Sequence, residues 1–227
     1  EEYDAIRSLR TLAAKSQSVV TIYALDHVLA YLGASLIEDF HEAYPSIILS
    51  VVDTTDAHAI AALASQQCSF AITAGPLDET RFEGDPLFFS HYSVRMHRSH
   101  PLAKLPALTY DDLDGQTIIS KGRAYDCFRH HIDKYFLAPG RKIHILAETA
   151  DESIIRTLLL HNKAINIGYD YADPLYPHPD IVSRTLKEEI SGQMIYLVSN
   201  PQVRKTKAAC LFRDYLLEWM KKKAAIG

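Results

Sequence analysis

The fold is decided by the stretch YLGASLIEDFHEAYPSIILSV, residues 31–51. Four of its apolar residues recur at the spacing of one face of an amphipathic helix: Leu32, Leu36, Ile37 and Phe40. Tyr44-Pro45 ends this helix, because helical backbone is disfavoured at the residue before a proline. An apolar run of strand type follows, so the stretch predicts one helix and then a strand.

The segments on either side extend this pattern into a sheet. A strand at Val19–Tyr23 precedes the helix, and a weaker helix at Ala57–Ala64 leads to another strand at Ser69–Thr73. A strand, a helix and a second strand form a βαβ unit, and two such units in series indicate an open α/β sheet.

The same logic recurs later in the chain. Residues Pro86–Met96 alternate apolar with polar side chains and predict a long extended strand. After it come a strand, a helix, a strand, a helix and a strand, at Gln116–Ser120, Asp126–Phe136, Lys142–Ala147, Glu152–His161 and Ala164–Tyr169. Gly192–Ser199 predicts a second crossover strand. A final helix at Lys205–Lys223 should pack back on the first half through Cys210, Leu211, Tyr215, Leu216, Trp219 and Met220.

Several short fragments, taken in order, resemble a known family. They are the helix–Tyr44-Pro45–strand passage, Phe70-Ala71-Ile72, His100-Pro101-Leu102-Ala103, and Asp112-Leu113 ahead of Ile118-Ile119. From about Ser18 to the C-terminus the chain is similar to the effector-binding domain of LysR-type transcriptional regulators. The resemblance implies a two-lobed α/β fold, periplasmic-binding-protein-like (type 2), with two βαβ subdomains joined by two crossover strands.

The resemblance also implies domain boundaries. Residues 1–17 would be the end of a linker helix, residues 18–89 and 200–227 lobe I, and residues 90–199 lobe II with the crossover strands. Glu1–Lys15 fits the linker, with apolar residues on one side and charges on the other. An ordinary N-terminal helix of a self-contained protein is the alternative. The DNA-binding helix-turn-helix of the family is absent from this chain.

Composition narrows the function classes. The 227 residues are 48% hydrophobic, enough for a sizeable core, and no apolar run approaches the ~20 residues of a membrane helix. With no basic-then-apolar segment at the N-terminus, we expect a soluble cytoplasmic protein without membrane contact. The three cysteines lie far apart among mostly apolar neighbours, so we expect structural thiols rather than disulfides: Cys68, Cys127 and Cys210.

The charge balance argues against DNA binding by these residues. The net charge is −4, whereas a DNA-binding domain usually carries a basic face. The lysines at 205, 207 and 221–223 are interpreted as a solvated face. Contact with DNA would come only through the missing N-terminal domain. The resemblance further implies a homodimer or homotetramer, built on Leu29–Phe40 and either the tail helix or Ala57–Ala64.

Ligands of open α/β sheets bind beyond the carboxyl ends of the strands. This rule brings together the segments Tyr23–His27, Asp53–Asp56, Ser120–Arg123 and Thr149–Asp151, with Tyr169 and Asp170 beside them. The predicted ligand-binding residues are Tyr23, Asp26, His27, Thr54, Thr55, Ser120, Lys121, Thr149 and Tyr169.

The chemistry of these residues leaves alternatives open. Relatives commonly show hydroxyl residues at the start of the first helix, where this chain has Asp26 and His27. Asp26 caps that helix, or else Asp26 or His27 forms a hydrogen bond with a ligand hydroxyl or amine; Thr54 and Thr55 either cap the next helix or face the cleft. Lys121 and Arg123 are either solvated or supply positive charge for an anionic ligand.

The aromatic residues bear on the kind of ligand, and the absence of catalytic motifs bears on enzyme activity. Tyrosines near the predicted site favour a ring-bearing ligand, although tyrosines also serve as packing residues: Tyr23, Tyr125, Tyr169 and Tyr171. The histidine spacings give no metal site, and no nucleophile elbow or phosphate loop is present, so we expect no cofactor and no enzyme activity. We predict a domain that senses a small molecule for a transcription factor; the alternative is a solute-binding protein or an enzyme of the same bilobal fold.

Overall fold

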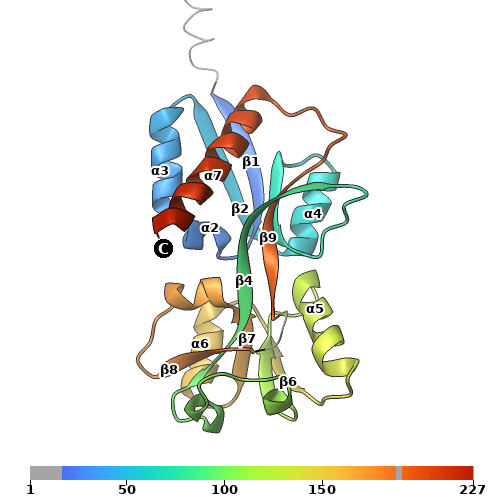
Figure 1. The fold of residues 1–227 in the computed structure, drawn as a ribbon, viewed down its shortest axis with the longest axis vertical. Helices are drawn as coiled ribbons and strands as arrows, with labels where there is room; N and C mark the ends of the chain where they lie inside the picture. Colours follow the sequence, from blue (N-terminus) through green and yellow to red (C-terminus); the bar gives the residue numbers. More distant parts are fainter. Residues whose placement is uncertain (1–16, 188–190, 227) are drawn as a thin grey trace, which may run out of the picture.

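The computed structural model describes residues 17–187 and 191–226, so the predicted helix at Glu1–Lys15 lies outside the described residues. Two α/β lobes stand end to end, joined by long strands (Figure 1). The two-lobed architecture predicted from the repeated βαβ pattern is thereby confirmed.

Lobe I is a sheet covered by helices on both faces. Its strands are β1 (Ser18–Leu25), β2 (Ile47–Thr54), β3 (Phe70–Ala74) and β9 (Gly192–Ser199). Its helices are α2 (Val28–Leu32), α3 (Ala34–Ala43), α4 (Asp56–Ala64) and α7 (Lys207–Ile226). Strand β1 lies between β2 and β3 and pairs in parallel with both, as a βαβ unit requires.

Lobe II repeats this arrangement. Its strands are β5 (Thr117–Ser120), β6 (His144–Glu148), β7 (Ile165–Tyr169) and β8 (Ile181–Thr185). Its helices are α5 (Asp126–Ile132) and α6 (Glu152–Leu160), with short helical turns η1 (Pro101–Lys104), η2 (Asp111–Leu113), η3 (Asp133–Leu137) and η4 (Asp170–Leu175). Strand β5 pairs in parallel with β6 and β7. The sequence pattern missed β8.

Strand β4 (Glu83–His97) belongs to both sheets. Its first part pairs with β9 in lobe I, and its last residues pair with β7 and β8 in lobe II. Among the described residues, strand β9 pairs only with β3 and the first part of β4, so its chain enters lobe I at Ser191–Gly192. A side chain at Gly192 would meet the Ser90 carbonyl oxygen at 2.3 Å, so this crossing needs glycine. The residue boundaries of the lobes stay a prediction.

Two predicted helices are interrupted. The helix expected through residues 31–44 is split into α2 and α3 by Gly33, whose φ of 100° is readily adopted only by glycine. The helix expected at Asp126–Phe136 ends at Ile132 and continues as the wider turn η3. In both places the apolar pattern runs on while the regular α-helix breaks, at Gly33 through a positive φ and after Ile132 through a wider hydrogen-bond register, and periodicity detects neither.

Helix α7 returns to lobe I and packs on α3. Phe212 and Tyr215 meet the ring of Phe40 with centroids 5.4 and 5.2 Å apart. Cys210, which was expected to face this contact, is exposed, so that prediction is wrong. Cys127 is buried and Cys68 half-buried, and all three thiols are free.

The core of lobe II contains a buried histidine. The His131 ring is fully buried, stacks on Tyr92 with centroids 3.8 Å apart, and its Nε2 lies 2.7 Å from the Tyr110 hydroxyl. Burial, and secondarily the neighbouring His130, lower the pKa of His131 to about 3. His131 is therefore neutral in the folded protein at every physiological pH.

This burial predicts a pH dependence of stability. Between about pH 6.5 and about 3 an unfolded histidine takes up a proton that the folded His131 excludes, so the free energy of unfolding should fall as pH is lowered. Urea unfolding from pH 7 to 4 should give a shallower slope for His131→Phe, by at most about 1.4 kcal/mol per pH unit. The matched control is His161→Gln, at an exposed histidine of lobe II. Equal slopes for wild type and His131→Phe would contradict the prediction.

Candidate functional site between the lobes

An ion pair joins the predicted strand ends across the two lobes. Lys121, which follows β5, places its Nζ 2.5 Å from Oδ2 of Asp26, which follows β1. Only 7% of the Lys121 side chain and 12% of the Asp26 side chain are exposed. Within residues 17–187 and 191–226 this is the only ion pair that links the lobes. We call it the interlobe ion pair.

His27 extends the interlobe ion pair. Its Nε2 lies 3.1 Å from Oδ2 of Asp26, and its Nδ1 lies 2.9 Å from the hydroxyl of Tyr176 in lobe II. Burial raises the pKa of Tyr176, so its hydroxyl keeps the proton that it can donate to Nδ1. His27 has a φ of 68°, a left-handed conformation that a non-glycine residue rarely adopts and that is frequent at functional sites.

Asp26 is ionised in this setting. Burial raises its pKa, but the contact with His27 and the charge of Lys121 outweigh burial, and the pKa ends below its usual value. The N-cap residue of α2 is His27, not Asp26, and no side chain caps that helix. The alternative that Asp26 serves as the helix cap is therefore wrong.

Two further contacts cross between the lobes. Asp56, in the first turn of α4, accepts hydrogen bonds from the backbone N–H groups of Asp126 at 2.9 Å and Cys127 at 2.6 Å. A lobe I carboxylate thus caps the start of α5 in lobe II. The Tyr171 hydroxyl donates to the Asp26 backbone carbonyl at 2.9 Å. Neither Asp56 nor Tyr171 was among the predicted site residues, because their partners lie far away in sequence.

The predicted hydroxyl residues border the interlobe ion pair from both lobes. Asp26 N donates to the Thr54 carbonyl, and Thr149 N donates to the Ser120 carbonyl, so these residues adjoin Asp26 and Lys121 respectively. Their hydroxyls shape local backbone or bond a neighbouring ring: Thr54 with His58 Nδ1, Thr55 capping α4, Ser120 accepting from Gly122 N, and Thr149 accepting from Asp151 N.

Aromatic rings surround Lys121. Its Nζ lies 5.4 Å from the ring centre of Tyr125 and 5.6 Å from that of Phe128. Tyr169 is buried and stacks on Tyr171 with centroids 5.7 Å apart. Tyr23 instead points toward α4, where its ring meets His58 edge-on. Lys121 is therefore held by Asp26 and by rings, while Arg123 is exposed.

Open space between the lobes lies where Asp56 of lobe I meets the start of α5 in lobe II. Two cavities of about 180 and 370 Å³ share Asp56, Ala74, Pro76 and Asp126, and so run along the start of α5. We call this space the interlobe groove. A third cavity, of about 490 Å³ with a mainly apolar lining, lies within lobe II next to Arg123 and Phe128.

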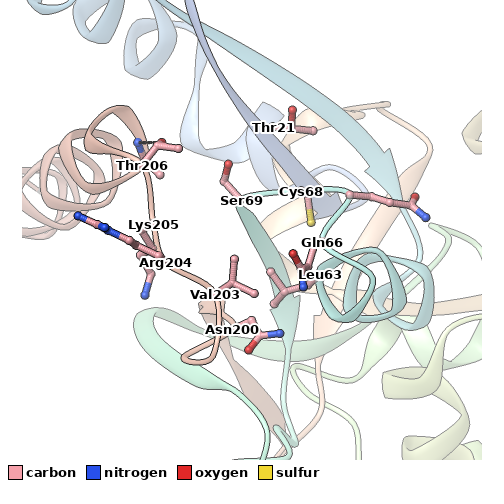
Figure 2. A pocket seen from close by; sticks show the side chains of 12 residues that line it. Thr21, Leu63, Gln66, Cys68, Ser69, Asn200, Val203, Arg204, Lys205 and Thr206 are labelled. Atoms are coloured by element: carbon pink, nitrogen blue, oxygen red, sulfur yellow. Dashed lines mark hydrogen bonds between the residues drawn. The ribbon is translucent and has the colours of Figure 1, made fainter.

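A separate cavity of about 300 Å³ lies in lobe I, at the amino end of β3 and away from lobe II. Figure 2 shows Thr21, Cys68 and Ser69 on one side of it and the loop before α7 on the other. Burial raises the pKa of Cys68 to about 11, so its thiol stays protonated. None of the predicted site residues lines this cavity.

The described residues contain neither a metal-binding cluster nor a membrane-spanning helix. No three histidine, cysteine, aspartate or glutamate side chains among them gather closely enough to hold a metal ion. In the same part of the chain, no helix combines the length and the apolar character needed to span a membrane.

Comparison with known proteins assigns the class. The model of the LysR substrate binding domain matches residues 13–221. The chain therefore belongs to the LysR substrate binding domain family, as its sequence fragments predicted. The HTH-type transcriptional regulator CysB of Burkholderia cenocepacia is 24% identical to it over 174 residues, which cover 76% of this chain and 55% of CysB. The chain thus spans about half the length of this curated relative.

Solved structures show the same fold. The effector binding domain of QuiR, in complex with shikimate, has a TM-score of 0.79 at 20% identity, covering 91% of this chain and 99% of that one. The regulatory domain of CcmR from Synechocystis PCC6803, in complex with 2-PG, has a TM-score of 0.80 at 15% identity, covering 90% of this chain and 98% of that one. The predicted periplasmic-binding-protein-like fold of type 2 is confirmed.

The interlobe ion pair predicts an asymmetric response to mutation. Lys121→Met leaves the Asp26 carboxylate buried without a cation and should lower the free energy of unfolding by about 3 kcal/mol at pH 7. Replacing both partners, Asp26→Asn with Lys121→Met, should recover most of this loss, because no charge is left unpaired. Urea unfolding measures both effects.

The control is the exposed pair Arg129–Asp126, whose side chains are more than half exposed. Arg129→Met should change stability by less than about 1 kcal/mol, because solvent screens exposed pairs. If Lys121→Met cost no more than Arg129→Met, the ion pair would not stabilise the contact between the lobes.

Proposed function

We propose that this domain senses a small organic molecule bound between its lobes, and that binding changes the geometry of an oligomer and thereby transcription of target genes. The observation that carries the proposal is the interlobe ion pair, which joins the ends of β1 and β5, where α/β sheets bind ligands. An effector bound at this junction can change the geometry only if it binds one arrangement of the protein more tightly than another.

The comparisons support this reading over a solute-binding protein or an enzyme of the same fold. CysB is named as a transcriptional regulator with a helix-turn-helix, and QuiR and CcmR were solved with small molecules bound to the corresponding domain. We propose that this domain works within a longer cytoplasmic protein that contacts DNA through a separate helix-turn-helix domain.

The proposed effector is ring-bearing or anionic, as the sequence predicted. The rings of Tyr125, Phe128 and Tyr169 near Lys121 favour a ligand with a ring. An anionic group would reach Lys121 only in competition with Asp26, since these two charges are already in contact.

Ligand screening tests the proposed site. A bound effector should raise the midpoint of thermal unfolding, because at a ligand concentration 100 times Kd it adds about 2.7 kcal/mol to the free energy of unfolding. A thermal-shift panel of small carboxylates, amino acids and phenols should yield a compound whose shift shrinks in Thr54→Val and Thr149→Val. The exposed Thr185→Val serves as the control. A ligand indifferent to both cleft variants would place the site elsewhere.

We also propose an isologous homodimer, alone or within a tetramer. Helix α3, inside the predicted surface Leu29–Phe40, exposes Ile37 at 40%. The tail helix α7 already uses its apolar side against Phe40, whereas α6 in lobe II exposes Ile154 at 46%. An antiparallel pair that packs α3 on α6 of the second copy would cover both side chains.

Sedimentation velocity at micromolar concentration tests this arrangement. The wild-type chain should sediment as a dimer or larger, and Ile37→Asp and Ile154→Asp should each shift it toward the 25.5 kDa monomer by placing a charge in the apolar contact. Leu137→Asp, at a similarly exposed apolar residue outside the proposed contact, is the control. A monomeric wild type would refute the proposal.

A further inference from the structure

The interlobe ion pair restricts which molecules can enter the strand-end junction. Asp26 and Lys121 neutralise one another at 2.5 Å, and both side chains are about nine-tenths buried. A ligand that reaches either charge must share it or displace its partner. The other contacts of Lys121 are aromatic rings, which cannot replace a carboxylate as a counter-charge.

A ligand with a single charge fits poorly here. A simple carboxylate that takes Lys121 leaves the Asp26 carboxylate buried beside a second anion, and a simple amine that takes Asp26 leaves the Lys121 ammonium unpaired. Leaving one partner of a buried pair uncompensated is strongly destabilising. A ligand with both charges avoids this penalty because it supplies a new partner to each side chain.

A second, independent observation concerns the other oxygen of Asp26. Oδ2 takes the contacts with Lys121 and His27, while Oδ1 is buried and has no hydrogen-bond partner among the described residues. Buried carboxylate oxygens normally accept a hydrogen bond, so Oδ1 has an unused acceptor position that no donor among the described residues fills. An ammonium group is the donor that also matches the charge.

We propose that the effector of this domain is a zwitterion of amino-acid type, with its ammonium group on Asp26 and its carboxylate on Lys121. The inference rests on the proposed function and names the ligand class of the same site. The rings of Tyr125 and Phe128 beside Lys121 would contact an apolar or aromatic side chain of the amino acid. The bound zwitterion then replaces the direct contact between the lobes with a bridged one.

Matched trios of compounds test the charge requirement directly. L-phenylalanine, 3-phenylpropionate and 2-phenylethylamine carry the same hydrocarbon side chain and differ in whether they have both an ammonium group and a carboxylate, the carboxylate alone or the ammonium group alone. L-leucine, 4-methylpentanoate and 3-methylbutylamine form a second such trio. Calorimetry is run with these trios and with the common L- and D-amino acids on the full chain. At least one amino acid should bind, and more tightly than its own carboxylate and amine by about tenfold or more.

Two substitutions should switch this preference. Asp26→Asn should weaken the amino acid and remove its advantage over the matched carboxylate, and Lys121→Met should remove its advantage over the matched amine. The double variant, Asp26→Asn with Lys121→Met, leaves no unpaired charge and should also lose the preference for the zwitterion. It replaces the single variants in this test if either of them fails to fold. Asp214→Asn and Lys104→Met, at exposed residues, are the controls and should bind as the wild type does.

The outcomes separate this inference from the proposed function. If a carboxylate without an amine bound as tightly as its amino acid, and Thr149→Val weakened it, the cleft would be a sensor site and the zwitterion inference would be overturned. The inference would also fall if no amino acid bound. An amino acid whose affinity ignored Asp26, Lys121, Thr54 and Thr149 substitutions alike would overturn both.

Discussion

Strand β4 is the element on which the rest of the structure depends. Its fifteen residues pair first with β9 and then with β7 and β8, so one strand supplies hydrogen bonds to both sheets. This sharing fixes how the two lobes face one another. The crossing is tight, since the returning chain passes the Ser90 carbonyl at a distance that only Gly192 allows. With the sheets held in this relation, the carboxyl ends of β1 and β5 meet.

The meeting point is then closed by charge and hydrogen bonding rather than by apolar packing alone. Lys121 binds Asp26, Asp56 caps α5, and hydroxyls of Tyr171 and Tyr176 reach back to lobe I. Buried ion pairs add little to net stability, but any arrangement that leaves one partner buried without the other is strongly destabilised. The contact between the lobes is therefore sensitive to the loss of either partner of the interlobe ion pair. The proposed effector would supply a counter-charge to each partner and avoid that penalty, and binding would thereby be coupled to the geometry of the lobes.

Local sequence predicted most of the elements but not their breaks or their distant contacts. The apolar spacing of Leu36 and Phe40 identified a helix face correctly, yet the pattern runs through Gly33, where a single positive φ divides the helix. For the site, the strand-end rule selected Asp26 and Lys121, which the fold brings into contact. It included Asp56 in the segment Asp53–Asp56 without assigning it a role, and it missed Tyr176, because nothing in their own neighbourhood distinguishes a helix-capping or a ring-bonding partner in the other lobe.

The sequence by itself determined the βαβ units, the stop at Tyr44-Pro45, the family, and the placement of polar residues at the ends of strands. These properties depend on spacing along the chain and on the backbone preferences of single residues, and both can be read from a short stretch of sequence. Only the tertiary structure decided that Asp26 and Lys121, 95 residues apart, neutralise one another instead of facing solvent. That pairing depends on the register of strands in two sheets joined through β4, and no local pattern encodes the distance between two such strand ends.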